Sequence, residues 1–354
     1  MGLKILHSAD WHLDSPFAGF DDSQRALLKQ EQQSIPGKTA QLCRREKCDL
    51  MLLAGDIFDG EPARETVEAL KKALSECGAR VFITPGNHDF CATGSVWLEE
   101  NWPENVYVFT GGLEAVTIPD LNCRVYGAGY QSMDSAPLLE NFRAEGSEKY
   151  CIAVLHGDPT RKDSPYCPIT AQQVRDSGLQ YLALGHIHKA GAFHAGGTLC
   201  AWPGCPMGRG WDETGKKGVC IVTVEDSASL RAVALDTIRF HELKADISSG
   251  AEAALEKILP PAGSRDFFRV TLTGSGEADI AKLTRRFSAV PNLTLRDETL
   301  PPLDIWGDTG ADTLEGVYFR LLREAMEADP DSREEIQLAA EISRKLLEGR
   351  EVTL

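Results

Sequence analysis

Residues of the kinds that bind metal ions stand in five short clusters along the first half of the chain. Each cluster follows or ends an apolar run that is typical of a β-strand. The side chains are carboxylates, imidazoles and one amide, and carboxylate with imidazole suits Mn²⁺, Fe²⁺ or Zn²⁺. The clusters are Asp10-Trp11-His12, Gly55-Asp56-Ile57-Phe58-Asp59, Gly86-Asn87-His88-Asp89, His156-Gly157 and Gly185-His186-Ile187-His188.

The chemistry that such a set supports is hydrolysis at phosphorus. Two metal ions about 3.5–4 Å apart can grip a phosphate, activate a water molecule and neutralise developing charge, and one carboxylate can bridge both ions. A single histidine is more often a hydrogen-bonded structural residue than a ligand. Five clusters in this order, each after an apolar strand, favour a metal site.

Alternating strands and helices must bring these clusters together. Apolar runs predict strands at 4–7, 49–54, 80–84, 152–155 and 181–184, with helices at 22–46 and 63–77. Pro36-Gly37 must break or bend the first of these helices. In layered α/β folds, sites collect at the carboxyl ends of the strands, so we expect the five clusters to meet there. The runs at 218–224 and 230–235 predict an antiparallel second sheet.

The rest of the chain predicts two further segments. We assign 1–240 to the catalytic domain and 241–300 to a small α/β domain. In the latter we expect helices at 249–259 and 278–289 and strands at 266–273 and 292–298. The segment 301–354 is acidic and contains two helices, about 312–327 and 331–349, separated by Asp329-Pro330-Asp331.

Composition narrows the class of protein. The 354 residues are 42% hydrophobic and 25% charged, as in soluble globular proteins, and no stretch is apolar enough to span a membrane. Because the start of the sequence lacks the apolar run of a signal peptide, we expect the chain to lie in the cytoplasm. We therefore expect its ten scattered cysteines to be reduced and mostly buried. The net charge of −16 speaks against coating nucleic acid by bulk electrostatics but permits a local metal-lined site.

The ordered clusters resemble those of the calcineurin-like metallophosphoesterases. Within that superfamily, the opening His7-Ser8-Ala9-Asp10-Trp11-His12-Leu13-Asp14-Ser15-Pro16-Phe17 is similar to the YhaO-type branch of the SbcD-like DNA repair exonucleases. The resemblance implies an α/β fold, a four-layer α/β/β/α sandwich of two mixed sheets, followed by a small α/β cap domain and C-terminal helices.

The same resemblance implies a role for each residue of the clusters. It implies two divalent metal ions, expected to be Mn²⁺ with Fe²⁺ or Zn²⁺ as alternatives. The implied ligands are Asp10, His12 and His188 for the first ion, Asn87, His156 and His186 for the second, and Asp56 as the bridge. His88 would contact the substrate phosphate or protonate the leaving oxygen, and Asp89 would orient the ring of His88. No covalent intermediate is implied.

Other residues have two interpretations each. His7 could orient Asp10 or Asp56, or be a buried strand-end histidine with a backbone partner. Asp59 could orient a ligand or cap a helix. The aromatic rings beside the first cluster could stack on a base, although core packing is the more common role for each alone; they are Trp11, Phe17 and Phe20. Arg161, Lys162, Arg209, Lys216 and Lys217 are candidates for phosphate contacts or for a solvated charged surface.

The clusters permit more than one function. The first hypothesis is a DNA repair nuclease, with DNA as substrate, an SMC-like ATPase of the SbcC or YhaN type as partner of the C-terminal helices, and a homodimer by resemblance. The second is a phosphodiesterase or phosphatase for a small nucleotide or phosphoprotein, which the negative charge favours. A non-catalytic scaffold is disfavoured because the ligand set is complete.

Overall fold

The computed structural model describes residues 2–235, 237–301, 303–350 and 352. The chain forms two compact units, Met1–His241 (unit 1) and Glu242–Leu354 (unit 2). The five clusters all lie in unit 1. The three-part division at 240 and 300 stays a prediction.

The first sheet of unit 1 has six strands in the order β12-β11-β1-β2-β3-β4. Four of them run parallel to one another: β1 (Leu3–Ser8), β2 (Leu50–Leu53), β3 (Arg80–Ile83) and β4 (Val106–Val108). β11 (Gly218–Val224) and β12 (Ala228–Ala234) are antiparallel, as predicted, but the prediction that they form a separate sheet is wrong. β11 pairs with β1, from Leu3 opposite Val224 to His7 opposite Cys220, so both strands extend the first sheet.

The second sheet repeats this mixed pattern in the order β5-β6-β7-β8-β10-β9. Its parallel centre consists of β6 (Cys123–Gly127), β7 (Tyr150–His156), β8 (Tyr181–Gly185) and β10 (Thr198–Trp202). The edge strands β5 (Glu114–Ile118) and β9 (Gly191–Ala195) pair antiparallel with their neighbours.

The two sheets pack face to face through side chains that alternate along each strand. In β2, Leu50 and Leu52 lie in a core cluster shared with Ile152 and Val154 of β7. The intervening residues of β7 turn to the other face, where Leu155 packs in a second cluster. Both faces are buried, which explains why these strands read as continuous apolar runs in the sequence.

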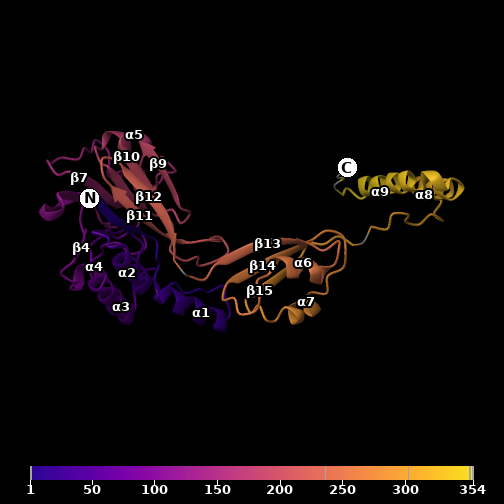
Figure 1. Cartoon of the computed structure of the whole chain (residues 1–354), viewed down its shortest axis with the longest axis horizontal. Coiled ribbons are helices and arrows are strands. Elements are labelled where there is room, and N and C mark those ends of the chain that lie inside the picture. Colours follow the sequence, from indigo (N-terminus) through magenta and orange to yellow (C-terminus); the bar gives the residue numbers. More distant parts are fainter. Residues whose placement is uncertain (1, 236, 302, 351, 353–354) are drawn as a thin grey trace. The chain divides into compact units, whose positions relative to one another are not determined.

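Helices complete the layers of unit 1. α1 (Asp22–Gln33) and α2 (Ile35–Glu46) are separate helices, because Pro36 stands in the first turn of α2, where its missing N–H costs no helical hydrogen bond. α3 (Arg64–Ser75) and the short α4 (Val96–Glu99) follow, and Pro119–Leu121 forms one 3-10 turn. α5 (Ala171–Asp176) lies beside β9 and β10, on the opposite side of the sheets from α2 and α3 (Figure 1). The predicted four-layer α/β/β/α sandwich is confirmed.

Unit 2 begins with a small α/β layer. Its three-stranded sheet has the order β13 (Phe240–Asp246, of which the first two residues belong to unit 1), β14 (Phe267–Thr273) and β15 (Leu293–Asp297). α6 (Ala251–Ile258) and α7 (Ile280–Arg286) connect the strands. Val270 and Leu272 of β14 pack with Leu255 of α6 and Leu283 of α7 in one apolar cluster.

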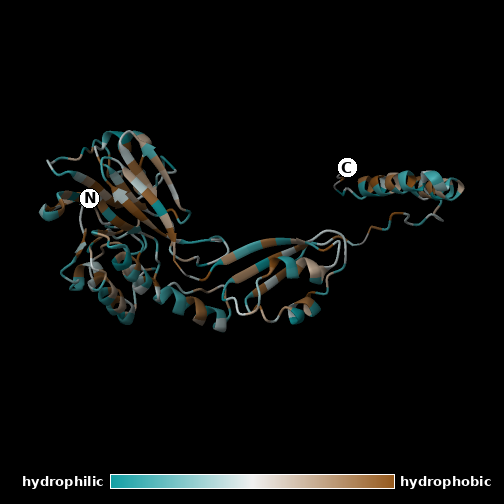
Figure 2. Ribbon diagram, in the orientation of Figure 1, coloured by the Kyte–Doolittle hydropathy of each residue, from teal (hydrophilic) through white to brown (hydrophobic). Residues whose placement is uncertain are grey.

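A helical hairpin follows, formed by α8 (Leu314–Ala328), the 3-10 turn Pro330–Ser332 and α9 (Arg333–Leu347). Few of its side chains are buried. Phe319 packs under the guanidinium of Arg344, which lies 4.0 Å from the ring centre and is paired with Glu315. Along both helices, apolar and polar residues are interleaved (Figure 2). Among the described residues, no helix combines the length and apolar character needed to cross a bilayer.

Candidate metal centre

The five clusters converge at the carboxyl ends of β1, β2 and β3 in one sheet and of β7 and β8 in the other. The sheets come close together there. The Nδ1 atom of His156, at the end of β7, lies 2.9 Å from the carbonyl oxygen of Ala54, just beyond β2. A Cβ atom at Gly185 would lie 1.8 Å from the same carbonyl oxygen, so only glycine fits at the end of β8.

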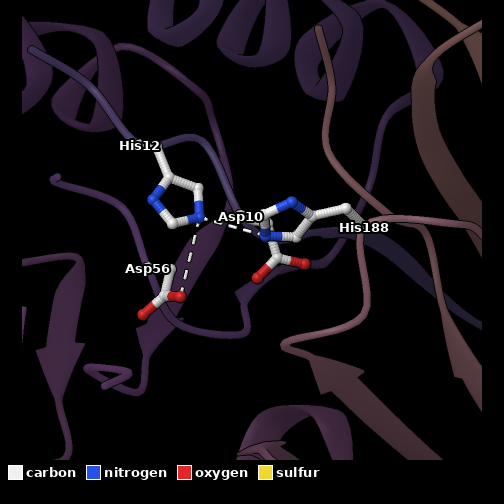
Figure 3. Close-up of side chains that lie close together, drawn as sticks. All are labelled: Asp10, His12, Asp56 and His188. Carbon is white, nitrogen blue, oxygen red and sulfur yellow. Dashed lines mark hydrogen bonds and ion pairs between the residues drawn. The ribbon is translucent and has the colours of Figure 1, made fainter. Parts of the chain in front are cut away.

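Four side chains bring one potential ligand atom each to within 4.8 Å of one another: Asp10, His12, Asp56 and His188. Nε2 of His12 lies 3.2 Å from Nε2 of His188 and 3.6 Å from Oδ2 of Asp56 (Figure 3). Asp10, His12 and Asp56 are buried, and His188 is partly exposed. These are the three residues predicted for the first ion, together with the predicted bridge.

Two observations show that this group fits a divalent cation. Oδ2 of Asp10 is buried and has no hydrogen-bond partner among the described residues, which is costly for a carboxylate oxygen. The two imidazole nitrogens that face each other at 3.2 Å can share at most one proton between them as a hydrogen bond. A cation among these atoms would satisfy all of them at once.

The three residues predicted for the second ion also lie together. Oδ1 of Asn87 is 3.0 Å from Nε2 of His156 and 3.3 Å from Nδ1 of His186. Oδ2 of Asp56 is 3.4 Å from Nε2 of His156, in addition to its approach to His12. Asp56 therefore stands between the two groups, where a bridging carboxylate would have to be. The assignment of each ligand to an ion stays a prediction.

The backbone at these positions adopts an uncommon conformation. Asp10, His12, Asp56 and His186 have positive φ angles of 53°, 45°, 49° and 92°. Residues other than glycine seldom adopt this region, and strained backbone of this kind clusters at functional sites. Hydrogen bonds between distant segments hold it in place: Oδ1 of Asp10 accepts the N–H of His186, and Oδ1 of Asp56 accepts the N–H of His88.

Asp59, for which the sequence left two roles open, orients two histidines. Its Oδ1 lies 3.3 Å from Nδ1 of His12 and 3.1 Å from Nδ1 of His88. The hydrogen bonds to His12 and His88 hold the pKa of the Asp59 carboxyl well below its usual range. The hydrogen bond to Asp59 raises the pKa of His88.

The prediction that Asp89 orients the ring of His88 is wrong. Both carboxylate oxygens of Asp89 accept backbone N–H groups instead, from Gly86 at 2.7 Å and from Ile57 and Phe58 at 2.8 and 3.1 Å. Asp89 is buried and ties the loop after β3 to the loop after β2. Asp89 therefore stabilises the two loops that carry Asn87 and Asp56.

Glu213, for which the sequence predicts no role, lies beside His188. Its Oε1 lies 2.6 Å from Nδ1 of His188, and its side chain is buried. A carboxylate that accepts the second ring N–H of a metal-binding histidine fixes the tautomer and the orientation of the ring. Glu213 lies outside the strand-end clusters, so no sequence pattern marks it.

For His7, Trp11 and Phe17, the structure supports the structural interpretation. His7 is buried, with Nδ1 2.7 Å from the Tyr181 hydroxyl and Nε2 3.0 Å from the Leu184 carbonyl oxygen, so both ring nitrogens have partners away from the ligands. Burial lowers the pKa of His7 to about 3. Trp11 and Phe17 are buried in the core of unit 1 and offer no ring face for stacking on a base. The ten cysteines are free thiols, all buried except the partly exposed Cys151.

Known proteins that are similar to this chain indicate the family to which it belongs. A family model described as calcineurin-like phosphoesterase matches residues 3–190. An uncharacterised metallophosphoesterase of Bacillus subtilis, YhaO, is 35% identical over 241 residues, which are 63% of this chain and 57% of YhaO. The chain therefore matches little more than half the length of that relative. The D subunit of the nuclease SbcCD from Staphylococcus epidermidis is 22% identical over 77% of this chain and 79% of its own.

Solved structures similar to this chain include TT1561 of Thermus thermophilus and a dimetal phosphatase from Danio rerio. The first is 12% identical with a TM-score of 0.41, over 66% of this chain and 99% of its own. The second is 12% identical with a TM-score of 0.43, over 67% of this chain and 98% of its own.

Proposed function

The chain belongs to the calcineurin-like phosphoesterases, and on that premise we propose that it is a metal-dependent phosphodiesterase that hydrolyses DNA as a repair exonuclease. We expect two Mn²⁺ ions, held by the two ligand groups that meet at Asp56. Such ions would supply positive charge at the phosphate and activate a water molecule.

His88 is the side chain best placed to act on the substrate. Its side chain is 47% exposed, whereas the ligands around it are mostly buried. Nδ1 is hydrogen-bonded to Asp59, so Nε2 is left to face a substrate. A histidine held in this way can contact the phosphate or protonate the leaving oxygen, a contribution of typically about 10²–10⁴ in rate.

We prefer DNA to a small molecule as the substrate because of the length of the match to the SbcCD nuclease chain. That match covers 77% of this chain, which is more than unit 1 alone can supply. The likeness therefore continues into unit 2, beyond the residues that hold the metal centre. A phosphatase for small substrates would need no such additional unit.

The net charge of −16 favours the second candidate, a phosphodiesterase or phosphatase for a small nucleotide or phosphoprotein. Proteins that bind DNA tightly usually carry a basic face. The two candidates share the metal centre and differ only in what they bind around it.

We also propose that the helical hairpin binds a partner, an SMC-like ATPase of the SbcC or YhaN type. Support comes from large apolar side chains of α8 and α9 that are more than half exposed, namely Leu314, Leu321, Leu338, Leu346 and Leu347. Burying such side chains against another protein removes apolar surface from water, which favours association.

The test is Mn²⁺-dependent turnover of end-labelled linear DNA beside the small diester bis-p-nitrophenyl phosphate. His88→Ala is the matched variant. We expect it to keep both metal ions and to turn over substrate about 10²–10⁴-fold more slowly than wild type. DNA cleavage that disappears in the variant supports the nuclease. Turnover of the diester without DNA cleavage, even after the candidate ATPase is added, supports the small-substrate enzyme. Unchanged diester turnover in the variant contradicts the role of His88.

A further inference from the structure

Arg209 lies beside the candidate metal centre and is held there by Glu213. The backbone N–H of Arg209 donates to Oε2 of Glu213 at 2.7 Å, and its Nη2 donates to Oε1 of Glu213 at 3.0 Å. The same Nη2 atom is 3.1 Å from Nδ1 of His188. Glu213 therefore fixes two groups at once, the ring of a predicted metal ligand and a guanidinium.

The guanidinium retains donor capacity that the protein does not use. Its Nε is buried and has no hydrogen-bond partner within the described part of the chain. A buried N–H without an acceptor is destabilising, so such a donor is expected to meet an acceptor in the working complex. The Arg209 side chain as a whole is 22% exposed, so a ligand in solution can reach part of it although Nε itself is buried.

Arg209 contacts His188, whose ring centre lies 5.0 Å from that of His12, and the ring centre of His12 lies 4.7 Å from that of His88. The hydrogen bond to Asp59 raises the pKa of His88, and the positive charge of Arg209 acts in the opposite direction. Any anion bound between the metal ligands and His88 would therefore experience the positive charge of Arg209.

We propose that Arg209 contacts a non-bridging oxygen of the phosphate group bound at the metal centre, and that Glu213 holds the guanidinium in place for this contact. A guanidinium suits the role because its donors lie in a fixed plane that matches phosphate oxygens, and because it stays charged. Preorganised donors of this kind stabilise charge that develops on the phosphate during hydrolysis. The inference rests on the proposed phosphoester hydrolysis and extends it by one residue.

The alternative role for Arg209 is purely structural. In that case the charge of Arg209 would only keep Glu213 ionised, so that Glu213 can hold the ring of His188. Removing the charge of Arg209 would then weaken metal binding. The two roles therefore differ in what is lost first, the phosphate or the metal ion.

The experiment measures binding of inorganic phosphate by isothermal titration calorimetry to the Mn²⁺-loaded full chain, after free Mn²⁺ has been removed. Wild type is compared with Arg209→Met and Arg209→Lys, and Mn²⁺ content is measured on each sample by mass spectrometry. Arg80→Met is the matched control, since Arg80 pairs with Asp120 on the surface at the start of β3, the opposite end of that strand from Asn87.

We expect Arg209→Met to keep the wild-type Mn²⁺ content and to bind phosphate about tenfold more weakly or worse, as for the loss of a hydrogen bond to a charged group. Arg209→Lys should recover part of the affinity, and Arg80→Met should match wild type. Wild-type phosphate affinity in metal-loaded Arg209→Met would overturn the proposal, as would loss of Mn²⁺ in that variant.

Hydrolysis of bis-p-nitrophenyl phosphate, measured on the same samples, separates this inference from the proposed function. If the wild type binds phosphate but hydrolyses no diester, the proposed function fails, whereas weaker phosphate binding by Arg209→Met still supports the contact. If the wild type binds no phosphate at all, the contact itself is contradicted.

Discussion

Three of the histidines in the candidate metal centre have one ring nitrogen fixed by an oxygen acceptor. Nδ1 of His156 meets the carbonyl oxygen of Ala54, Nδ1 of His188 meets Glu213, and Nδ1 of His12 meets Asp59. In each case Nε2 is the atom left for the centre. Because the protonated nitrogen is the one that faces the acceptor, the other presents its lone pair, which is what a metal ion requires.

At this scale, Asp56 is expected to serve both ions. We predict that Asp56→Asn weakens both together, by more than the ~10–100-fold that loss of an outer partner costs. The variant should fold, because an amide oxygen can still accept the N–H of His88, which Asp56 Oδ1 accepts at 2.9 Å. Titration calorimetry with Mn²⁺ and elemental analysis check this prediction. Loss of one ion alone would contradict the bridging position.

His7 predicts a dependence of stability on pH. Burial lowers the pKa of His7 to about 3 in the folded chain, against an ordinary value of 6.5. Between these values the unfolded chain binds the proton and the folded chain does not, so His7 reduces stability as the pH falls below about 6.5. The reduction reaches about 2 kcal/mol at about pH 5.

His7→Gln removes this proton uptake and can still hydrogen-bond to Tyr181 or Leu184. Urea unfolding in the presence of a chelator, from about pH 7 to about pH 5, should show a smaller loss of stability in the variant than in wild type. Parallel curves for the two proteins would rule out the effect of His7.

At the scale of elements, the centre depends on how closely β8 and the end of β2 approach. The Cβ of an alanine at position 185 would lie 1.8 Å from the carbonyl oxygen of Ala54 and 3.0 Å from Cβ of Ala9. Neither neighbour is the flexible end of a long side chain, so the backbone itself must move.

We therefore predict that Gly185→Ala lowers the free energy of unfolding by roughly 1–3 kcal/mol, the typical cost of overpacking. It should also weaken metal binding, because His186 and His188 follow directly. Gly197→Ala is the matched control, since a Cβ atom there meets nothing within 4 Å. Urea unfolding measures both, and equal stability of the two variants would contradict the steric argument.

At the scale of the whole molecule, the predicted ligands all belong to unit 1, and unit 2 contributes none of them. Metal binding should then stabilise unit 1 and leave unit 2 unchanged. A ligand present at about 100 times its dissociation constant stabilises the state that binds it by about 2.7 kcal/mol.

We predict that Mn²⁺ slows hydrogen exchange at the carboxyl ends of β1, β2, β7 and β8, and that a chelator reverses this. Exchange in β14 and β15 should stay the same in both conditions. Mass spectrometry of peptides from the full chain provides the measurement, and equal protection of β14 would show that metal binding is not confined to unit 1.

Much of this arrangement follows from local sequence. Continuous apolar runs predict buried strands, and the polar residues that follow them, such as Asp10 and His156, must then lie where the strands end. The break at Pro36 is also local, because proline lacks the N–H that a helix interior needs. These inferences hold because each depends on the chemistry of a few consecutive residues.

Contacts between distant segments were decided only by the tertiary structure. The partner of His88 is Asp59 rather than the adjacent Asp89, because the loops after β2 and β3 turn the Asp89 carboxylate towards backbone N–H groups. The pairing of β11 with β1 and the contact of Glu213 with His188 likewise join segments that no periodic pattern connects. Strand formation depends on local propensity and burial, but which strands and side chains meet depends on the packing of the two sheets as a whole.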